Sequence, residues 1–324
     1  MRLSHPGVFN QWVTAVLLAI AIASPASAQI RMLTIMAPAA PGGGWDQTSR
    51  EMQKVIEENH LANAAKVVNV PGAGGTIGLA QFVDANKGNG DVLMTMGLIM
   101  VGAVLTNQSP VTLQQVTPIA RLTGEYEILV VPAASPFKSL DEFIQAWKQD
   151  PGKYAIAGGS AGGTDHMLAG LLAKAVGIEP TKINYIPHSG GGESIASLVG
   201  NHLPVGVNGL AEMVPFIKTG RLRALAISSD KRLEGLDIPT FVEQGVDLVL
   251  ANWRGVVAPP GISAQQSAAL RAVVERMVKT PGWKAVLEKN DWIDMYQSGP
   301  EFEEFLKQED IRATAVLKSI GLVK

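Results

Sequence analysis

Four glycine-rich segments stand where a strand pattern gives way to a helix pattern, at residues 38–46, 71–78, 158–164 and 188–193. Each brings consecutive peptide N–H groups, free of side chains, to the start of a helix. Unpaired N–H groups and about half a positive charge point outward there. A single turn of this kind indicates only tight backbone geometry. Four of them at strand ends can converge on one cleft, which favours anion binding by the backbone.

A serine in the third segment offers a different chemistry, because residues 158–162 read GGSAG and fit the G-x-S-x-G pattern of a hydrolase nucleophile. In that fold an acid and then a histidine follow the serine, but the last of the five histidines is His202. The acids between the two are Asp165, Glu179 and Glu193. None has the long downstream spacing that a triad needs. We therefore interpret Ser160 as a hydroxyl donor to an anion, with a serine esterase as the alternative.

The sequence lacks the residues that nucleotide, metal or nucleic-acid binding would need. No G-x-G-x-x-G or G-x-x-x-x-G-K-[ST] sequence is present, so a nucleotide cofactor is not expected. The chain has no cysteine, which excludes disulfides and thiolate metal sites, and no His/Asp/Glu spacing predicts a metal site. A formal net charge of −2 without a Lys/Arg block argues against nucleic-acid binding.

Several isolated residues have two readings each. Asp46 either caps its helix or orients the first glycine-rich loop. His166 and His188 are more typical of satisfied polar residues than of metal ligands. Arg50 fits a solvated helix face, and Trp253 and Arg254 fit packing where the chain crosses between domains.

The N-terminus has the pattern of a secretory signal peptide. Arg2 precedes an uncharged run from Trp12 to Ala23, and residues 26–28 read ASA, an A-x-A cleavage site. We expect cleavage after Ala28 and secretion of the mature chain. The other apolar run, residues 92–105, is interrupted by Thr95 and fits a buried strand and helix, so the mature chain is not expected to span a membrane.

Strand and helix patterns alternate after the signal peptide, which predicts an α/β fold with mainly parallel sheets flanked by helices. About 296 mature residues exceed one core, so we expect two domains. Residues 29–130 with 251–324 form the first, discontinuous domain, and residues 131–250 form the second. Strands are expected at 33–37, 66–70, 92–95, 128–131, 154–157, 182–186, 204–207, 223–227 and 255–257. Helices are expected at 46–58, 77–84, 139–148, 164–176, 193–198, 211–219, 264–278 and 300–320.

The glycine-rich segments, taken together, resemble a known family. The runs are APAAPGGGWD at 37–46, NVPGAGGTIG at 69–78, SAGGTDH at 160–166, PHSGGG at 187–192 and GRLRALA at 220–226. With residues 239–245 and 253–259, they resemble the substrate-binding proteins of tripartite tricarboxylate transporters. The resemblance covers nearly the whole mature chain. Two segments depart from the family pattern, at residues 91–96 and at His188.

This resemblance implies a two-domain periplasmic binding protein of type 2-like fold that closes by a hinge over a small carboxylate and delivers it to membrane permease subunits. A periplasmic sensor subunit that presents the same ligand remains an alternative. First-domain contacts carried over are Pro41, Gly42, Gly43, Gly44, Asp46, Gly72, Ala73, Gly74, Gly75, Thr76 and Gly78. Second-domain contacts are Ser160, Thr164, His166, Ser189, Gly190 and Asn208. The ligand stays open among citrate, another tricarboxylate, a dicarboxylate and an aromatic acid.

Overall fold

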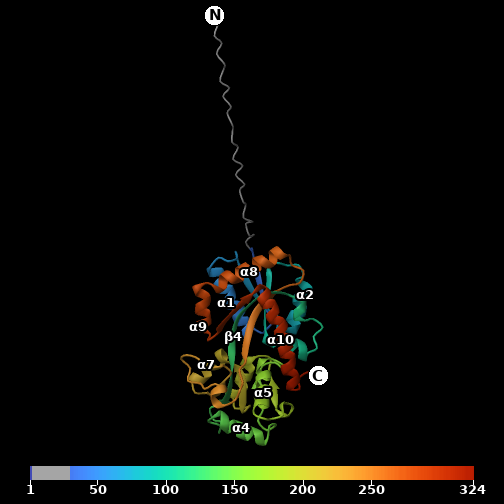
Figure 1. Ribbon diagram of the computed structural model, residues 1–324. Helices are drawn as coiled ribbons and strands as arrows, with labels where there is room; N and C mark the ends of the chain where they lie inside the picture. Colours follow the sequence, from blue (N-terminus) through green and yellow to red (C-terminus); the bar gives the residue numbers. More distant parts are fainter. Residues whose placement is uncertain (2–29) are drawn as a thin grey trace.

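The computed structural model describes Met1 and residues 30–324 (Figure 1). Apart from Met1, the predicted signal peptide lies outside the described residues. No helix in the described part of the chain combines the length and apolar character that crossing a bilayer requires.

The first half of the molecule is built on three parallel strands, with β1 between β2 and β3. All six residues of β3 are buried, as expected of a strand covered on both faces. Each of these strands leads through a short turn into a helix. The strands are β1 (Leu33–Ala37), β2 (Ala65–Asn69) and β3 (Val92–Gly97), and the helices are α1 (Gly44–Glu58), α2 (Thr76–Ala85) and α3 (Leu98–Thr106).

The second half repeats this arrangement, with β5 parallel to β6 and to β7. Its strands are β5 (Ile156–Gly158), β6 (Tyr185–Pro187), β7 (Val205–Gly209) and β8 (Leu222–Ile227). Its helices are α4 (Leu140–Gln149), α5 (Thr164–Ala175), α6 (Gly191–Val199) and α7 (Leu210–Lys218). Because parallel strands end at the same sheet edge, the turns into α5, α6 and α7 lie together.

Two antiparallel strands connect the halves: β4 (Thr117–Pro132) and β9 (Ala251–Ala258). The sheet order is β2-β1-β3-β9-β4-β7-β5-β6, with β8 and β10 (Ile293–Ser298) also paired to β4. Figure 1 shows β4 running from the upper half into the lower one. The sequence pattern predicted only residues 128–131 of this strand. The polar residues Arg121, Thr123, Glu125 and Glu127 interrupt its apolar pattern, yet the last three are buried.

The α/β class is therefore confirmed, with a mixed sheet because the two crossing strands pair antiparallel. The pattern missed β10 and α9 (Pro281–Lys289), which are short and only partly apolar. The remaining helices are α8 (Ala264–Val278) and α10 (Gly299–Ser319), with short 3-10 turns η1 (Ala73–Gly75), η2 (Leu113–Gln115), η3 (Pro180–Lys182) and η4 (Val242–Gln244).

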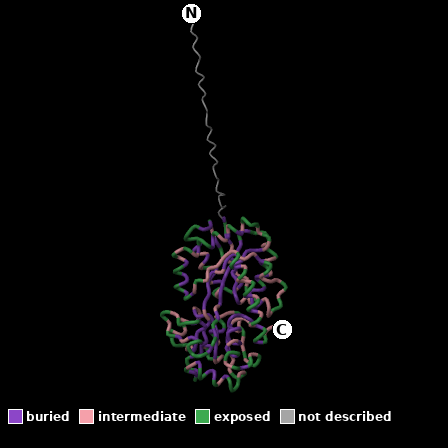
Figure 2. The backbone as a smooth tube through the Cα atoms, in the orientation of Figure 1, coloured by how far each residue is buried: buried purple, intermediate pink, exposed green. Residues whose placement is uncertain are grey.

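The buried core follows the sheet through both halves, as the buried residues in Figure 2 show. One apolar cluster belongs to the first half and a second to the other half, whereas the largest contains residues of both. Because the crossing strands and this cluster continue through the proposed boundary, the division at residues 130 and 251 stays a prediction.

Candidate functional site

Six helices follow the parallel strands β1, β2, β3, β5, β6 and β7, and every one of them has a glycine N-cap without a side-chain hydrogen bond. By contrast, α4, α8 and α9 are capped by the hydroxyls of Ser139, Ser263 and Thr280. A side-chain cap occupies N–H groups of the first turn. Its absence leaves these donors free for a ligand. The six glycines are Gly43, Gly75, Gly97, Gly163, Gly190 and Gly209.

Asp46 holds the first loop in shape from within the first turn of α1. Its Oδ2 accepts hydrogen bonds from the Gly42 N–H at 2.8 Å and from Arg50 Nε at 2.9 Å, and its Oδ1 accepts from Asn69 Nδ2 at 2.8 Å. Asn69 also donates to the Ala39 carbonyl at 3.0 Å, which ties the first loop to the second. Burial raises the pKa of Asp46, but these hydrogen bonds outweigh it and lower the pKa overall. The carboxylate therefore orients the first loop, which is one of the two roles that the sequence allowed for Asp46.

The second loop approaches the third across the two halves of the molecule. Gly74 has φ +61°, and a Cβ added there would lie 2.5 Å from Ala103 Cβ and 3.5 Å from Ser160 Oγ. Gly102 of α3 faces the Gly162 carbonyl so closely that a Cβ would collide with it. The halves thus already touch on the side formed by α3 and residues 160–163.

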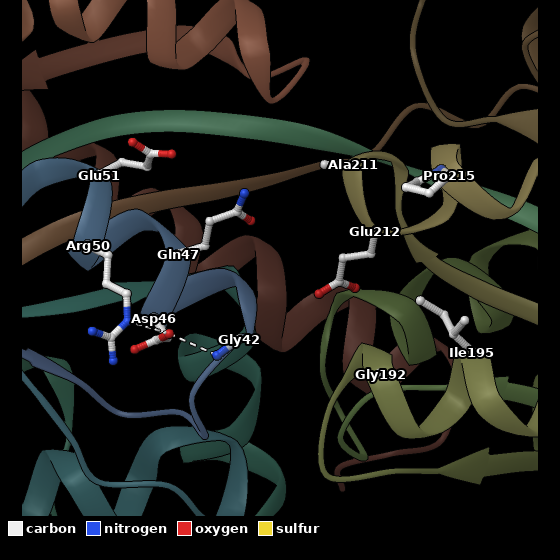
Figure 3. Close-up of a pocket in the computed structure, with 10 residues that line it drawn as sticks. All are labelled: Gly42, Asp46, Gln47, Arg50, Glu51, Gly192, Ile195, Ala211, Glu212 and Pro215. Carbon is white, nitrogen blue, oxygen red and sulfur yellow. Dashed lines mark hydrogen bonds and ion pairs between the residues drawn. The ribbon is translucent and has the colours of Figure 1, made fainter. Parts of the chain in front are cut away.

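On the other side a cleft of about 550 Å³ separates the two halves. Figure 3 shows α1 on one wall, and α6 and α7 on the other, with Glu212 turned toward α1. The volume falls within the range of small-molecule sites. The lining residues are Gly42, Asp46, Gln47, Arg50 and Glu51 on the first wall, and Gly192, Ile195, Ala211, Glu212 and Pro215 on the second.

A buried ionic group that the sequence reasoning missed lies where β4 and β9 cross. Arg254 is 4% exposed and forms an ion pair with Glu125, which is 2% exposed. A Cβ on Gly44 would lie 2.5 Å from Arg254 Nη2, so the guanidinium lies against the N-terminus of α1. Its Nη1 has no hydrogen-bond partner among the described residues. Burial lowers the pKa of Arg254 to about 10, which still leaves it charged at neutral pH.

Three further carboxyls lie close to one another: Glu127 on β4, Asp165 on α5 and Glu212 on α7. Burial, together with the charges of Asp165 and Glu212, raises the pKa of Glu127 well above its usual range. Burial raises the pKa of Asp165 to about 6, against an opposing hydrogen bond from the Gly159 N–H. Burial and the Asp165 charge raise the pKa of Glu212 to about 7. Glu125 and Glu127 stand within an otherwise largely apolar strand, and this was the sequence signal that could have indicated buried carboxyls here.

The second-domain residues expected to contact ligand occupy different environments. Ser189 is exposed, and its N–H donates to Glu193 Oε2 at 3.0 Å, while Gly190 caps α6 next to the cleft. Asn208 is buried and hydrogen-bonded to Ser194 Oγ at 2.8 Å. Thr164 is fully buried, and its Oγ1 has no partner among the described residues.

His166 closes the third loop. Its ring stacks on Tyr185 with centroids 3.9 Å apart, and Nδ1 accepts a hydrogen bond from the Gly162 N–H at 3.3 Å. Burial lowers the pKa of His166 to about 4, so the ring is neutral at pH 7. The hydrogen bonds of residues 30–324 include none between Ser160 and a histidine. Those residues also contain no group of three or more potential ligands placed to hold a metal ion.

Of the first-loop predictions, the structure places Gly42 and Asp46 on the cleft wall, with Gly43 and Gly44 at the start of α1. In the second loop, Gly72, Ala73, Gly75, Thr76 and Gly78 lie around η1 and the start of α2 beside Gly74. Pro41 is exposed at the tip of the first loop. Their contact with a ligand stays a prediction.

The family profile described as "Tripartite tricarboxylate transporter family receptor" (TctC) matches residues 49–322. The chain is 28% identical to Protein BugT of Bordetella pertussis over 275 residues, covering 82% of each protein. Among solved structures, a TctC solute-binding protein from Polaromonas without ligand is 27% identical, with a TM-score of 0.66 over 89% of this chain and 98% of that one. MatC from Rhodopseudomonas palustris with bound malate has a TM-score of 0.77 at 23% identity, over 89% and 99%.

The relatives and the arrangement of the loops both indicate a solute-binding protein. The family and the similar structures are solute-binding proteins rather than enzymes, which removes the esterase alternative for Ser160. The profile spans most of the chain, from the second turn of α1 to the segment after α10. This chain belongs to the tripartite tricarboxylate transporter receptor family of periplasmic solute-binding proteins.

Proposed function

We propose that this protein captures a small dicarboxylate or tricarboxylate in the cleft between α1 and the α6–α7 pair, and closes over it by a hinge motion. The observation that carries the proposal is the glycine N-caps of α1, α6 and α7, the three helices whose residues line one cleft. Their free N–H groups and helix dipoles supply a positive potential without a salt bridge. The Arg254 guanidinium, which is paired with Glu125, lies behind Gly44 against the N-terminus of α1.

The distribution of the loops supports hinge closure. The first and second loops belong to one half of the molecule, and the third and fourth to the other. A ligand that contacts both sets binds the closed form more tightly than the open form, so it shifts the population toward closure. The bound malate of MatC, a fold relative, supports a dicarboxylate of this size.

Membership of this family supports a proposal for the partner and the location. A receptor of this family serves a transporter, and we propose that the closed, liganded form delivers its ligand to membrane permease subunits. An N-terminal secretory signal peptide, as expected from residues 1–28, would place it in the periplasm.

Thermal shift and calorimetric titration of the purified protein test the binding function. A panel should include malate, succinate, citrate and, as a neutral match in size, succinamide. A ligand at 100 times its Kd adds about 2.7 kcal/mol of stability, which raises Tm by several degrees. We expect at least one of these carboxylates to do so and succinamide to have no effect. Equal stabilisation by succinamide, or binding by no carboxylate in a wider panel, would contradict the proposal.

A further inference from the structure

The sheet is narrowest where β4 and β9 cross between the two halves. β9 last pairs with β3 at Arg254, and β4 first pairs with β7 at Glu127. Between these points, among the strands that the structure describes, residues 125–126 of β4 pair only with residues 251–252 of β9. A two-stranded ribbon twists more than a wide sheet and is less stable by itself. We therefore expect the halves to rotate about this ribbon.

A single buried ion pair at this ribbon touches both walls of the cleft. The Arg254 guanidinium lies in the first half, 5.2 Å from the ring centroid of Trp292 and against Gly44 at the start of α1. Its partner Glu125 lies against Gly209, the N-cap of α7, where an added Cβ would be 2.7 Å from Oε1 and 2.9 Å from Oε2. The pair thus connects the helix starts of the two walls.

The glycines at these two helix starts are explained by space. Neither Gly44 nor Gly209 has the positive φ that favours glycine. At both positions an added Cβ would collide with the ion pair, whose buried side chains cannot withdraw into solvent. Helix α1 is also fixed to its own half, because Gln47 Nε2 donates to Asn290 Oδ1 at 2.7 Å. The sequence at both helix starts therefore fits the ion pair closely.

The contacts of the pair are incomplete in this structure. Nη1 of Arg254 and Oε2 of Glu125 are both buried, and neither has a hydrogen-bond partner within residues 30–324. Buried polar atoms are rarely left unpaired, because each costs free energy comparable to a lost hydrogen bond. A rotation about the ribbon moves the start of α1 relative to the start of α7 and changes the surroundings of both atoms. The energy of the pair therefore depends on how far the halves have closed.

We propose that the Arg254–Glu125 ion pair is the positioning contact of the hinge and sets the starts of α1 and α7 in the orientation that binds the ligand. The inference rests on the proposed function, because it concerns how the cleft captures its ligand. Neither residue is among those that line the cleft, so both act through the helices they touch. Without the pair, ordering the two helix starts around a ligand would reduce the affinity.

Replacing both residues together separates positioning from a contribution to stability alone. Loss of one partner leaves a buried charge unpaired, whereas replacement of both by apolar residues of similar volume is often neutral. Arg254→Met combined with Glu125→Leu should therefore keep the Tm and the circular dichroism spectrum of the parent protein. Its affinity for a carboxylate that stabilises the parent should fall about tenfold or more in calorimetric titration. Parent affinity in the folded double variant would overturn the positioning role.

A charge-conserving variant tests the same role without an apolar replacement. Arg254→Lys keeps the positive charge but loses the planar fork of the guanidinium, so the contact with Glu125 changes in geometry. We expect a folded protein with weaker ligand binding than the parent and stronger binding than the double variant. Affinity equal to that of the parent would count against the pair as a positioning contact.

The ion pair of Arg271 and Glu303 provides the matched control. It joins α8 and α10 within the first half, with Nη2 and Oε1 3.1 Å apart. Arg271→Met combined with Glu303→Leu should leave the ligand affinity unchanged. An equal loss of affinity in both double variants would show that the effect does not come from the hinge, and would overturn the inference.

Hydrogen exchange of the unliganded protein keeps this inference apart from the proposed function. In the double variant of Arg254 and Glu125, amides of residues 44–48 and 210–214 should exchange faster, because these helix starts have lost their common contact. Amides of residues 191–195, at the start of α6, should be unaffected. Unchanged exchange at the starts of α1 and α7 would overturn the positioning role even if carboxylates bind. Binding of no carboxylate by the parent protein would instead overturn the proposed function, and the positioning role with it.

Discussion

Two acidic side chains hold opposite loops of the cleft by the same contact. Asp46 accepts the N–H of Gly42 at 2.8 Å, and Glu193 accepts the N–H of Ser189 at 3.0 Å, in each case four residues earlier in the chain. Each bond folds the loop back onto the first turn of its helix. A carboxylate in that turn also interacts favourably with the helix dipole. The loop shape is thus fixed by side chains, while the next N–H groups remain available to a ligand.

Gly74→Ala tests the close approach of the second loop to the other half. Alanine at φ +61° costs about 1 kcal/mol, and its Cβ would also have to displace Ala103. Gly177→Ala is the matched control, since it has φ +80° and nothing within 4 Å of the added Cβ. Urea unfolding should show a larger loss of stability for Gly74→Ala, and calorimetry should show weaker ligand binding for that variant alone. Equal effects of the two substitutions would mean that the loop contact is unimportant.

The raised pKa values of Asp165 and Glu212 predict how the stability of the unliganded protein depends on pH. Their folded values of about 6 and about 7 lie above the usual 3.8 and 4.5, so the folded state binds these protons more tightly. The stability they contribute is present below pH 4 and is lost as pH rises toward 7. Glu212→Gln should flatten this loss by on the order of 1–3 kcal/mol, measured by urea unfolding from pH 5 to 8. Glu58→Gln should keep the original slope, and an unchanged slope in Glu212→Gln would show that its carboxyl is not perturbed.

At the scale of elements, the helices divide by how they begin. Those that start at the carboxyl ends of the parallel strands have glycine N-caps, while α4, α8 and α9 have serine or threonine caps that accept a backbone hydrogen bond. Serine is a better N-cap than glycine by only a few tenths of a kcal/mol. The glycine caps therefore cost little stability, and those of α1, α6 and α7 leave free donors at the cleft.

Gly190→Ser tests whether these donors serve the ligand. An added Cβ at Gly190 has nothing within 4 Å, so the serine fits, and its hydroxyl can accept from an N–H of the first turn of α6. We expect unchanged or slightly higher stability with weaker ligand binding. The opposite pattern is expected for Ser263→Ala in α8, which loses a capping box and about 1 kcal/mol of stability without affecting binding. Thermal unfolding and calorimetry of both variants decide this, and unaltered affinity in Gly190→Ser would argue against a backbone anion site on α6.

At the scale of the whole molecule, the two halves pack against each other on one side of their interface, and the cleft separates them on the other side. Helix α10 belongs to the first half, where Trp253 Nε1 donates to its Glu309 at 2.7 Å, and Ile320 at its end packs on Gly170 of α5 in the second half. Figure 1 shows the end of α10 reaching toward α5. Together with the contact of Gly102 and Gly162, this fixes the α3–α5–α10 side. Closure is therefore expected on the α1–α7 side, where the cleft lies.

Small-angle scattering tests this motion in solution. Adding a carboxylate that binds in the thermal-shift panel should reduce the radius of gyration, because the cleft of about 550 Å³ closes. A panel compound that does not bind, such as succinamide, is the control at the same concentration. An unchanged radius at saturation with a tight ligand would show that capture occurs without hinge closure.

The sequence by itself determined the loops and the elements that carry them. The glycine-rich runs predict uncapped helix N-termini because that property depends on adjacent residues, and the structure has glycine N-caps at Gly43, Gly163 and Gly190. The strand patterns of β1 and β3 predict buried parallel strands because their residues are apolar except for one threonine in each. The combination of loops was also specific enough to indicate the family.

Only the tertiary structure brought the ionic residues of the cleft together. Glu127, Asp165, Glu212 and Arg254 come from four separate elements, and no local spacing relates them. Their burial and shifted pKa values arise because β4 and β9 cross between the halves and the starts of α5 and α7 close over the crossing. The full length of β4 could not be predicted from the sequence either. Glu125 and Glu127 are typical of exposed positions, and only the other half of the chain buries them.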